Sequence, residues 1–519
     1  MRITLLAINS KYVHSSLAVW QLASGVATHC RQEHDVSVLE ATVNQSVAQI
    51  AEQIMAQQPD VLGISTYIWN AHMLPQLFAL LRAQLPKTAI VLGGPEATHN
   101  AAYWLEQGAD HVINGAGEQQ FAALLDDYIA ATPVASLDPY SEEYFHALGG
   151  RIAYIETSRG CPFRCTYCLS GESKLEFVPL DLTKAQIAKL ARSGTRTIKF
   201  VDRTFNANAQ RACDIWEYIL TLNSDCCFHF EVAADLFDEQ SLQLLSRVAP
   251  GKIQLEIGLQ SFHEPTLVAV QRKTNLEKAQ KSIRRLVAMG NIHVHVDLIA
   301  GLPEENLATF AQSFNRAYAL GTHKLQLGFL KLLHGSKLRG QAQSLGLVYH
   351  KEPPYELISS PWLSEDDLQW LKTAENALQH TYNQGRLLGT LEYVLAATKL
   401  SPLELFYGMG QAVPHHATPL VGYTTQLAQY FIALPNVKKD ILHDHLCCDL
   451  LRMTRGQCMP DFLQCHGKQR KQVQQRASEQ LGRPVCAKEV AVLTDGCGVY
   501  IDSMQQNPVT GLYTLNCLR

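Results

Sequence analysis

The sequence predicts an α/β protein with a doubly wound parallel sheet first, a partial TIM-like (β/α)6 barrel next and a mainly helical region last. Two alternations of short apolar runs with amphipathic stretches, over residues 1–130 and 151–345, predict the first two units. From about residue 350 this alternation stops and helical patterns dominate. The 519 residues, 47% of them hydrophobic and 18% charged, supply material for several cores. We predict domains at 1–130, 151–345 and 346–519, with a linker over 131–150.

The first unit contains five runs typical of buried parallel strands, at residues 2–9, 35–43, 60–69, 88–94 and 111–115. Amphipathic stretches between them, such as "SVAQIAEQIMAQQ", predict helices on both faces of the sheet. A doubly wound sheet binds ligands beyond the carboxyl ends of its strands. Those ends carry Gly93 and Gly94 and, after the last strand, "GAGE". Glycine lets the backbone approach a large ligand closely, although helix–strand turns also use glycine for geometry alone.

The second unit contains six strand patterns, at residues 152–158, 197–202, 228–235, 252–260, 292–300 and 324–332. Helical patterns separate them, including "LTKAQIAKLARS" and "ENLATFAQSFNRAYALG". Six such units predict a partial barrel, in which chemistry is expected at the carboxyl ends of the strands and in the loops that follow. Beyond the barrel, residues 364–385 and 423–446 predict helices, and the last 40 residues contain short strand-like pieces.

The loop after the first barrel strand contains "CPFRCTYC", in which Cys161, Cys165 and Cys168 have a C-x3-C-x2-C spacing. A structural zinc site usually takes four protein ligands in two pairs, and this loop has no fourth cysteine. Four-iron clusters normally take four thiolates, so three would leave one iron open to an external ligand. Zinc and three free thiols are the alternatives. Fourteen cysteines in a chain whose N-terminus does not read as an export signal predict a reducing compartment, the cytoplasm.

The motif "CPFRCTYC", with Tyr167 before its last cysteine, resembles the signature of radical S-adenosylmethionine enzymes, whose fold is a partial barrel of six units. In that family S-adenosylmethionine chelates the open iron of a 4Fe-4S cluster. An electron from the cluster cleaves it to a 5′-deoxyadenosyl radical, which abstracts hydrogen from a substrate. The resemblance implies that Cys161, Cys165 and Cys168 are the metal-binding and catalytic residues and that Tyr167 lies at the cofactor.

Two further segments, "IGLQSFHEPTLVAVQRKT" and "DLIAGLPEE", resemble the branch that includes oxygen-independent coproporphyrinogen dehydrogenase. The matching positions imply that Glu231, Gln260, Arg272 and Asp297 contact the amino acid and ribose parts of S-adenosylmethionine. Arginine suits this role because it pairs with a carboxylate in bidentate fashion, while ion pairing at the barrel rim is the alternative. The family's glycine-rich segment after the second strand, which helps to hold the methionine amino group, reads "FVDRTFNAN" here. Asp202 is the candidate substitute.

The flavodoxin-like unit directly before the barrel resembles the cobalamin-binding domain of cobalamin-dependent radical enzymes, through "DVLGISTYIWNA", "AIVLGGPEAT" and "INGAGE". The D-x-H-x-x-G motif, which supplies a histidine to cobalt in some cobalamin domains, does not occur. His14 could approach the corrin from the first loop or serve as a surface or packing residue. The residues for which the resemblance implies corrin contact are Ser65, Thr66, Tyr67, Gly93 and Gly94.

The implied function is that of a cobalamin-dependent radical enzyme that methylates an unactivated carbon; ring contraction and cyclisation are alternatives within the same subclass. A non-catalytic tetrapyrrole-binding chaperone is a further alternative. A methylthiotransferase is disfavoured, because that family holds a second cluster on three cysteines of its N-terminal domain, where this sequence has only Cys30. The expected partners are a substrate that the sequence does not identify and an electron donor such as flavodoxin or ferredoxin.

Other patterns are less specific. No apolar run reaches the eighteen residues of a membrane span, and a net charge of -4 gives no bulk positive field for nucleic acid. The basic segment near residue 470 is a solvated helix face or an RNA contact. The motif "PHH" at 414–416 lines a cavity or caps a helix. Structural thiols or an auxiliary cluster explain the cysteines of the C-terminal region, Cys447, Cys448, Cys458 and Cys465.

Overall fold

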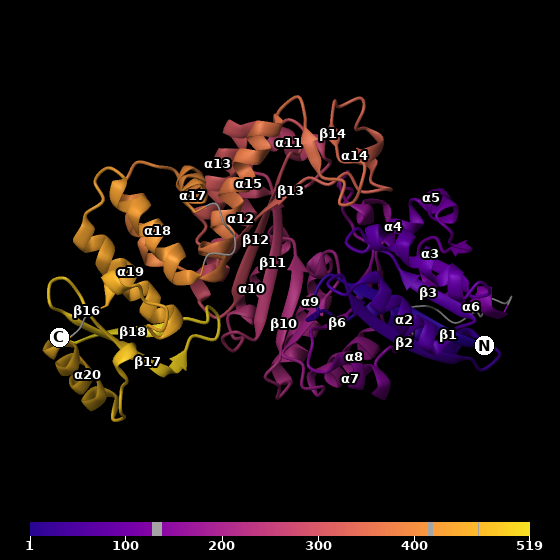
Figure 1. The fold of residues 1–519 in the computed structure, drawn as a ribbon, viewed down its shortest axis with the longest axis horizontal. Coiled ribbons are helices and arrows are strands. Elements are labelled where there is room, and N and C mark those ends of the chain that lie inside the picture. Colours follow the sequence, from indigo (N-terminus) through magenta and orange to yellow (C-terminus); the bar gives the residue numbers. More distant parts are fainter. Residues whose placement is uncertain (127–136, 414–418, 465–466, 519) are drawn as a thin grey trace.

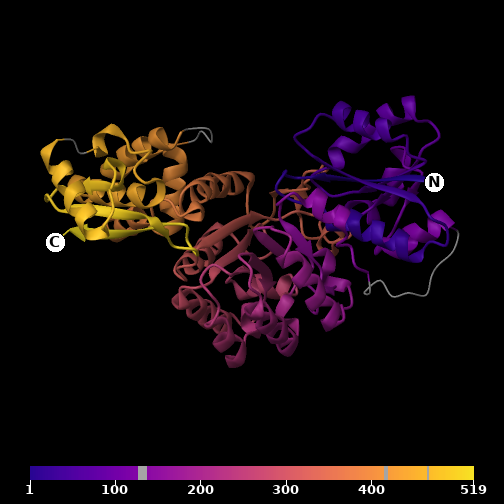
Figure 2. The same ribbon diagram turned by 90° about the horizontal axis from the view of Figure 1, so that it is seen from below.

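The computed structural model describes residues 1–126, 137–413, 419–464 and 467–518, and for Glu172 the backbone alone. Three parts follow one another along the long axis, with the barrel between the N-terminal and C-terminal parts (Figures 1 and 2). None of the described helices combines the length and the apolar character needed to cross a membrane.

The N-terminal part is a five-stranded parallel sheet in the order β2-β1-β3-β4-β5, as predicted. Side chains of β1 alternate between two cores: Leu5 packs towards α1 and α6, and Leu6 towards α2 and α3. The chain steps from β1 outwards to β2 and then crosses back over β1 to β3, so the switch point of the sheet lies between β1 and β3, where a crevice opens at the carboxyl ends of the strands. The elements are β1 (Arg2–Asn9), α1 (Leu17–His29), β2 (Asp35–Thr42), α2 (Val47–Gln57), β3 (Val61–Ser65), α3 (Leu74–Gln84), β4 (Ala89–Gly93), α4 (Pro95–Thr98), α5 (Ala101–Glu106), β5 (His111–Val112) and α6 (Gly117–Asp126).

The predicted linker contains helix α7 (Glu142–Leu148) among its described residues 137–150. Tyr140 and Tyr144 are buried, and the Tyr140 hydroxyl donates a hydrogen bond to the Tyr154 carbonyl at 2.8 Å. This part of the segment is therefore packed onto the barrel. The sequence pattern missed the helix because it is only seven residues long.

The barrel sheet has the six predicted strands, all parallel, in the order β13-β12-β11-β10-β9-β6. On β11 the residues Ile253, Leu255 and Ile257 are fully buried under the outer helices, whereas Gln254 and Glu256 alternate with them and face the lumen. The lumen is consequently polar. The elements are β6 (Ala153–Ile155), β7 (Ser158–Arg159), β8 (Glu176–Phe177), α8 (Leu180–Ala191), β9 (Thr197–Phe200), α9 (Ala209–Thr221), β10 (Cys227–Val232), α10 (Glu239–Leu245), β11 (Ile253–Gln260), α11 (Glu264–Ala269), α12 (Leu276–Met289), β12 (His293–Ala300), α13 (Leu307–Tyr318) and β13 (Lys324–Phe329).

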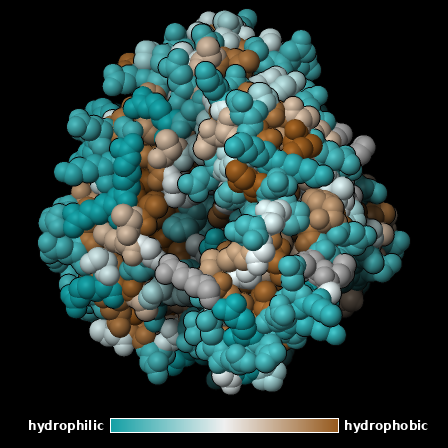
Figure 3. Space-filling model, turned by 90° about the vertical axis from the view of Figure 1, so that its left-hand side faces the viewer, coloured by the Kyte–Doolittle hydropathy of each residue, from teal (hydrophilic) through white to brown (hydrophobic). Residues whose placement is uncertain are grey.

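The remaining part is mainly helical, as predicted, and its strand-like pieces form a three-stranded antiparallel sheet, β16-β17-β18. The basic segment near residue 470 is helix α20, on which Val473 and Ala477 form the buried side. Figure 3 views the molecule from its C-terminal end and shows a mostly hydrophilic surface, with hydrophobic side chains scattered among the hydrophilic ones. The elements are α14 (Lys337–Gly340), β14 (Val348–Tyr349), β15 (Leu357–Ser359), α15 (Glu365–His380), α16 (Leu388–Ala397), α17 (Pro402–Ala412), α18 (Leu420–Ala433), α19 (Lys439–Thr454), α20 (Lys468–Leu481), β16 (Val490–Val492), β17 (Gly498–Gln506) and β18 (Tyr513–Leu518).

Candidate functional site

The three motif cysteines lie in a tight loop after β7. Gly160 opens this loop at φ +89°, and a Cβ there would lie 2.2 Å from the carbonyl oxygen of Lys174. Only glycine fits so close to the returning chain. The Cys168 amide donates to the Cys165 carbonyl at 3.1 Å, which curls the loop so that the three thiols line one cavity.

This barrel cavity has a volume of about 190 Å³ and lies at the carboxyl ends of β9 to β12. It gathers residues separated by more than 100 positions in the sequence. The predicted residues that line it are Cys161, Cys165, Tyr167, Cys168, Glu231, Gln260, Arg272 and Asp297. The structure therefore brings together eight of the nine residues expected at the cluster and at S-adenosylmethionine.

Arg272 is held between the cysteine loop and β11. Its Nη1 lies 3.4 Å from the Tyr167 hydroxyl and 3.7 Å from Cys165 Sγ, while Nη2 donates to the Gly258 carbonyl. Its Nε and the Oε1 of Gln260 are both shielded from solvent and have no hydrogen-bond partner among the described residues. A buried polar atom without a partner is costly, so both atoms are well suited to a polar ligand.

A β-bulge presents Gln260 to the cavity. The pairing of β11 with β12 shifts register between Gly258 and Gln260, and Gln260 has φ +72°. Strain of this kind in a non-glycine residue is typical of functional sites. A Cβ on Gly258 would lie 2.3 Å from Gln260 Nε2, so glycine is needed at 258 for the Gln260 side chain to fold back across it.

Acidic groups line the lumen side of the cavity. Burial raises the pKa of Glu231 to about 7, and the negative charge of Glu256 adds to this effect; Lys199 lies 3.8 Å away and opposes it. Burial would also raise the pKa of Glu256, but a hydrogen bond with His229 and the charge of Lys199, each at 3.2 Å, outweigh it and leave that pKa well below its usual range. Glu231 thus holds a proton more readily than its neighbour. The alternative role of Glu231, an ion pair at the barrel rim, is weakly supported, because its partner Lys199 lies 3.8 Å away.

Asp202 departs from the prediction, because it does not line the barrel cavity. Its carboxylate is 1% exposed and accepts hydrogen bonds from the Thr157 amide at 2.7 Å, the Thr157 hydroxyl at 2.6 Å and the Ser158 hydroxyl at 2.7 Å. It therefore ties the end of β9 to the strand that leads into the cysteine loop. The residues that follow it, Arg203 and Thr204, line the cavity instead.

Sequence reasoning also missed Glu256 and Phe163 as lining residues. A signal for Glu256 was available, because it lies two residues before Gly258 and four before Gln260 on one strand and must share their face. Phe163 offered no signal beyond its place between two of the cysteines.

The second cavity lies at the carboxyl ends of β3 and β4 and has a volume of about 380 Å³. Ser65, Gly93 and Gly94 line it, as predicted. A Cβ on Gly93 or Gly115 would meet nothing within 4 Å, so both glycines border open space. Gly94, at φ +96°, instead brings the chain against Thr66, whose carbonyl oxygen would lie 2.7 Å from a Cβ. The glycines therefore leave space for a large ligand at these strand ends.

Three candidates for the corrin do not line this cavity. Thr66 is fully buried behind it, and Tyr67 stacks on Trp69 at 4.3 Å between ring centroids. His14 Nδ1 instead lies 2.5 Å from the Tyr154 hydroxyl, where β1 meets the barrel. The sequence pattern did not indicate these positions.

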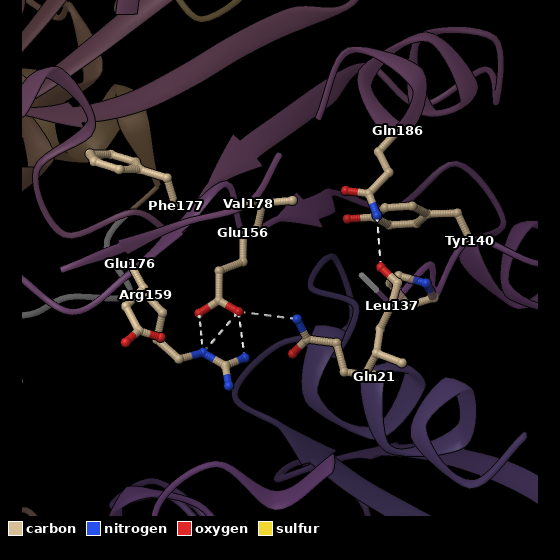
Figure 4. A pocket seen from close by; sticks show the side chains of 10 residues that line it. Gln21, Leu137, Tyr140, Glu156, Arg159, Glu176, Phe177, Val178 and Gln186 are labelled. Carbon is tan, nitrogen blue, oxygen red and sulfur yellow. Dashed lines mark hydrogen bonds and ion pairs between the residues drawn. The ribbon is translucent and has the colours of Figure 1, made fainter. Parts of the chain in front are cut away.

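Residues of the barrel that no sequence motif marked extend the N-terminal cavity towards the barrel. Glu156, Arg159 and Ser173, from the barrel, line the N-terminal cavity together with Gln21 and Glu118. Arg159 Nη2 lies 2.8 Å from Glu118 Oε1 and 2.6 Å from Glu156 Oε2. Figure 4 shows Glu156 between Arg159 and Gln21, beside a small pocket of about 80 Å³.

The C-terminal candidates do not form a second metal centre within the described part of the chain. Cys447 and Cys448 lie side by side on α19, and neither they nor Cys458 belong to a cluster of metal-ligand groups. Cys465 and the motif at 414–416 lie outside the described residues.

Comparison with known families divides the chain in the same way. Residues 3–125 match the B12 binding domain, residues 155–317 match the radical SAM superfamily, and residues 343–490 match a protein family of unknown function (DUF4080).

Among similar proteins are an uncharacterized methyltransferase, PH0819, of Pyrococcus horikoshii and the cobalamin-dependent radical SAM methyltransferase TokK of Streptomyces tokunonensis. The first is 22% identical over 325 residues, which cover 54% of this chain and 69% of that protein. The second is 22% identical over 324 residues, which cover 54% of this chain and 47% of that protein. This chain thus spans about half the length of TokK.

A solved structure with the same fold is that of the cobalamin-dependent S-adenosylmethionine radical enzyme OxsB, with aqua-cobalamin and S-adenosylmethionine bound. The TM-score is 0.59 at 14% identity, over 86% of this chain and 78% of that one. The domain matches and the two adjoining cavities lead to one conclusion: the chain joins a B12-binding domain to a radical SAM domain and belongs to the cobalamin-binding radical S-adenosylmethionine enzymes.

Proposed function

We propose that this protein is a methyltransferase that transfers a methyl group to an unactivated carbon. The observation that carries the proposal is the pair of adjoining cavities, one at the three cysteines and one in the B12-binding domain. The amide of Cys161, which lines the barrel cavity, donates a hydrogen bond at 3.4 Å to the carbonyl of Ser173, which lines the N-terminal cavity, so the two cavities lie on either side of the cysteine loop. Methyltransferases among the similar proteins support this choice.

The residues present fit the three cofactors. Cys161, Cys165 and Cys168 would ligate a 4Fe-4S cluster and leave one iron open. The unpartnered atoms of Arg272 and Gln260 suit the amino acid end of S-adenosylmethionine, and the open space at Gly93 and Gly115 suits a corrin. When bound, these groups supply one-electron cleavage of S-adenosylmethionine and a methyl group carried on cobalt.

The protein's own contribution is placement. The Arg272 guanidinium orients a carboxylate near Cys165, and the polar lumen residues Glu231 and Asp297 accept hydrogen bonds from amino or hydroxyl groups. Ionised Glu231 is the better acceptor, so its raised pKa makes ligand affinity sensitive to pH near 7.

The test is anaerobic purification with cobalamin supplied, followed by metal, optical and product analysis. We expect about four irons per chain, as one cubane requires. We also expect a corrinoid spectrum, and 5′-deoxyadenosine and S-adenosylhomocysteine once reductant and S-adenosylmethionine are added. Iron without corrinoid uptake would contradict the role of the N-terminal cavity. Deoxyadenosine without S-adenosylhomocysteine would contradict methyl transfer and favour a rearrangement.

We further propose an electron donor such as flavodoxin or ferredoxin and a location in the cytoplasm. Thirteen described cysteines are free thiols, which fits a reducing compartment. Reduction of the reconstituted cluster by each donor protein, followed optically, tests the first proposal, and fractionation of cells tests the second.

A further inference from the structure

We propose that Glu305 is a positioning residue for the binding of S-adenosylmethionine. Through the hydroxyl groups of Ser261 and Ser313, it fixes the turn that presents Gln260 to the barrel cavity. Glu305 and the two serines do not line that cavity themselves. Any effect of Glu305 on the ligand must therefore pass through the residues that it holds. The inference rests on the contact between Gln260 and S-adenosylmethionine that the proposed function assumes.

Gln260 needs support because its backbone conformation is strained. It is the last residue of β11, and its φ of +72° lies in the left-handed region. A residue with a side chain rarely adopts this conformation and keeps it only where the surrounding structure holds it. The three residues that follow, 261–263, lead directly into α11. Whatever fixes the backbone of these three residues also fixes the turn that contains Gln260.

Two serine hydroxyls hold this backbone. The Oγ of Ser261 accepts a hydrogen bond from the His263 amide at 2.8 Å. The Oγ of Ser313, on α13, accepts one from the Phe262 amide at 3.0 Å. Both hydroxyls direct their own hydrogen to the same atom, because Ser261 and Ser313 each donate to Glu305 Oε1 at 2.7 Å. The carboxyl group thus sets the direction of both hydroxyls, and the hydroxyls hold the turn.

The burial of the cluster makes this arrangement depend on Glu305. Ser261 and Glu305 are 0% exposed and Ser313 is 1% exposed, so solvent cannot replace a lost partner. The two hydroxyls lie 3.3 Å apart. Without the carboxyl group they would share one hydrogen between them, and the other hydroxyl would lose its acceptor. The Oε2 of Glu305 has no hydrogen-bond partner among the described residues, so the contacts of Oε1 are the ones that favour a buried carboxyl here.

The same network also fastens α13 to the end of β11, which is a purely structural role. The two roles differ in one measurable quantity. If Glu305 acts through Gln260, its removal weakens ligand binding only while Gln260 is present. A carboxyl group that only stabilises the fold would instead change the affinity by the same factor whether or not Gln260 is present.

The experiment measures the affinity for S-adenosylmethionine by equilibrium dialysis of the full-length, reconstituted protein. The variants are Glu305→Ala, Gln260→Ala and the double variant. We expect Glu305→Ala to bind about tenfold more weakly than the wild type, and the double variant to bind no more weakly than Gln260→Ala alone. Glu305→Gln should restore the wild-type affinity, because its amide oxygen still accepts from both hydroxyls. The iron content per chain should be the same in every variant.

The control variant is Glu489→Ala, which removes a buried carboxyl group of the C-terminal part, paired with Arg483, and should keep the wild-type affinity. Wild-type affinity in Glu305→Ala or in Gln260→Ala would overturn the proposal. So would an equal loss on removal of Glu305 in both backgrounds. If Glu305→Ala does not fold, Ser313→Ala replaces it in the same cycle, because it removes the acceptor of the Phe262 amide. Dialysis follows binding without turnover, so these outcomes are independent of the test of methyl transfer.

Discussion

Arg272 and Gln260 each bring a buried polar atom to the barrel cavity and leave it without a partner among the described residues. Such an atom costs about 1–3 kcal/mol when it stays unsatisfied. This cost by itself indicates that both atoms bind a ligand. At the scale of single residues, the cavity is therefore best tested at Arg272, because part of its guanidinium group is already held by Tyr167 and Gly258.

Arg272→Lys should weaken the binding of S-adenosylmethionine by about tenfold to a hundredfold, since lysine lacks the planar fork that reaches Gly258, Tyr167 and a carboxylate together. Equilibrium dialysis with the reconstituted protein measures this change. Arg285→Lys is the matched control, because Arg285 is paired with Glu239 on the exposed surface. Equal affinity in both variants would show that Arg272 does not contact the ligand.

Glu305 allows a prediction about pH. Burial raises its pKa to about 7 from an ordinary value of 4.5, and hydrogen bonds from Ser261 and Ser313 oppose the shift. The folded state therefore keeps a proton that the unfolded state loses. This contribution to stability is fully present below pH 4.5 and is lost as pH rises through 7.

Glu305→Gln should remove this loss, so its advantage over the wild type should grow between pH 5 and 8, up to about 3 kcal/mol. The midpoint of urea unfolding at each pH measures it. Glu304→Gln, one residue earlier and exposed, should behave as the wild type. A pH-independent difference for Glu305→Gln would mean that the carboxyl is already ionised in the folded protein.

The strand-end turns decide, at the scale of elements, where a ligand can approach. Strand β4 ends at Gly93, which borders open space, and Gly94 then turns the chain against Thr66. The two adjacent glycines therefore have different structural roles. One leaves room for a ligand, and the other allows the backbone to pass.

Gly93→Leu should fold but fail to take up cobalamin, because its side chain would enter the N-terminal cavity where a Cβ meets nothing within 4 Å. The corrinoid absorbance per chain after purification with cobalamin measures this loss. Iron content serves as the internal control and should not change. Gly340→Ala, on α14 with the same free space around it, should bind normal amounts of both. Full corrinoid uptake by Gly93→Leu would place the corrin elsewhere.

The relative position of the B12-binding domain and the barrel depends on a few polar contacts at the scale of the whole molecule. Arg151 pairs with Glu40 at 3.0 Å, and Arg159 with Glu118 at 2.8 Å. A third contact comes from the segment that follows the barrel: the Tyr355 hydroxyl donates to Glu96 at 2.5 Å, and both residues are buried. These contacts hold the B12-binding domain against the rest of the molecule.

Tyr355→Phe should loosen this docking, because it leaves the buried Glu96 carboxyl without that donor, at a cost of about 1–3 kcal/mol. Hydrogen exchange should become faster in α4 and in β15, and methyl transfer should slow while iron and corrinoid contents stay the same. Tyr103→Phe, at a half-exposed ring of the same domain, is the control. Unchanged exchange in Tyr355→Phe would show that the contact does not hold the domains together.

Much of the fold could be predicted from the sequence, because hydrophobic periodicity is a local property. All eleven predicted strands of the two parallel sheets occur, and β1 has the predicted bounds, Arg2–Asn9. The cysteine motif also predicted the place of the barrel cavity, which its three thiols line. Helix α7 was missed because a seven-residue helix has too few turns to show a period.

The candidate site was predictable only where a motif or a strand end marked a residue. Gln260, Arg272 and Asp297 were found in this way and line the barrel cavity. Asp202 was chosen for its place at a strand end, but its side chain turns inward to Thr157 and Ser158, and Arg203 takes the outward position. A strand end gives the location of a side chain, while its direction depends on what packs around it.

The sequence by itself determined the order of the elements, the two parallel sheets and the three thiols at one barrel mouth, because each follows from periodicity or spacing over a few residues. Only the tertiary structure decided that Tyr355 meets Glu96, 259 positions away, and that barrel residues help to line the cavity of the B12-binding domain. Such contacts depend on how domains dock and on how side chains turn within the packed interface. No local sequence pattern encodes how the domains dock or how these side chains turn.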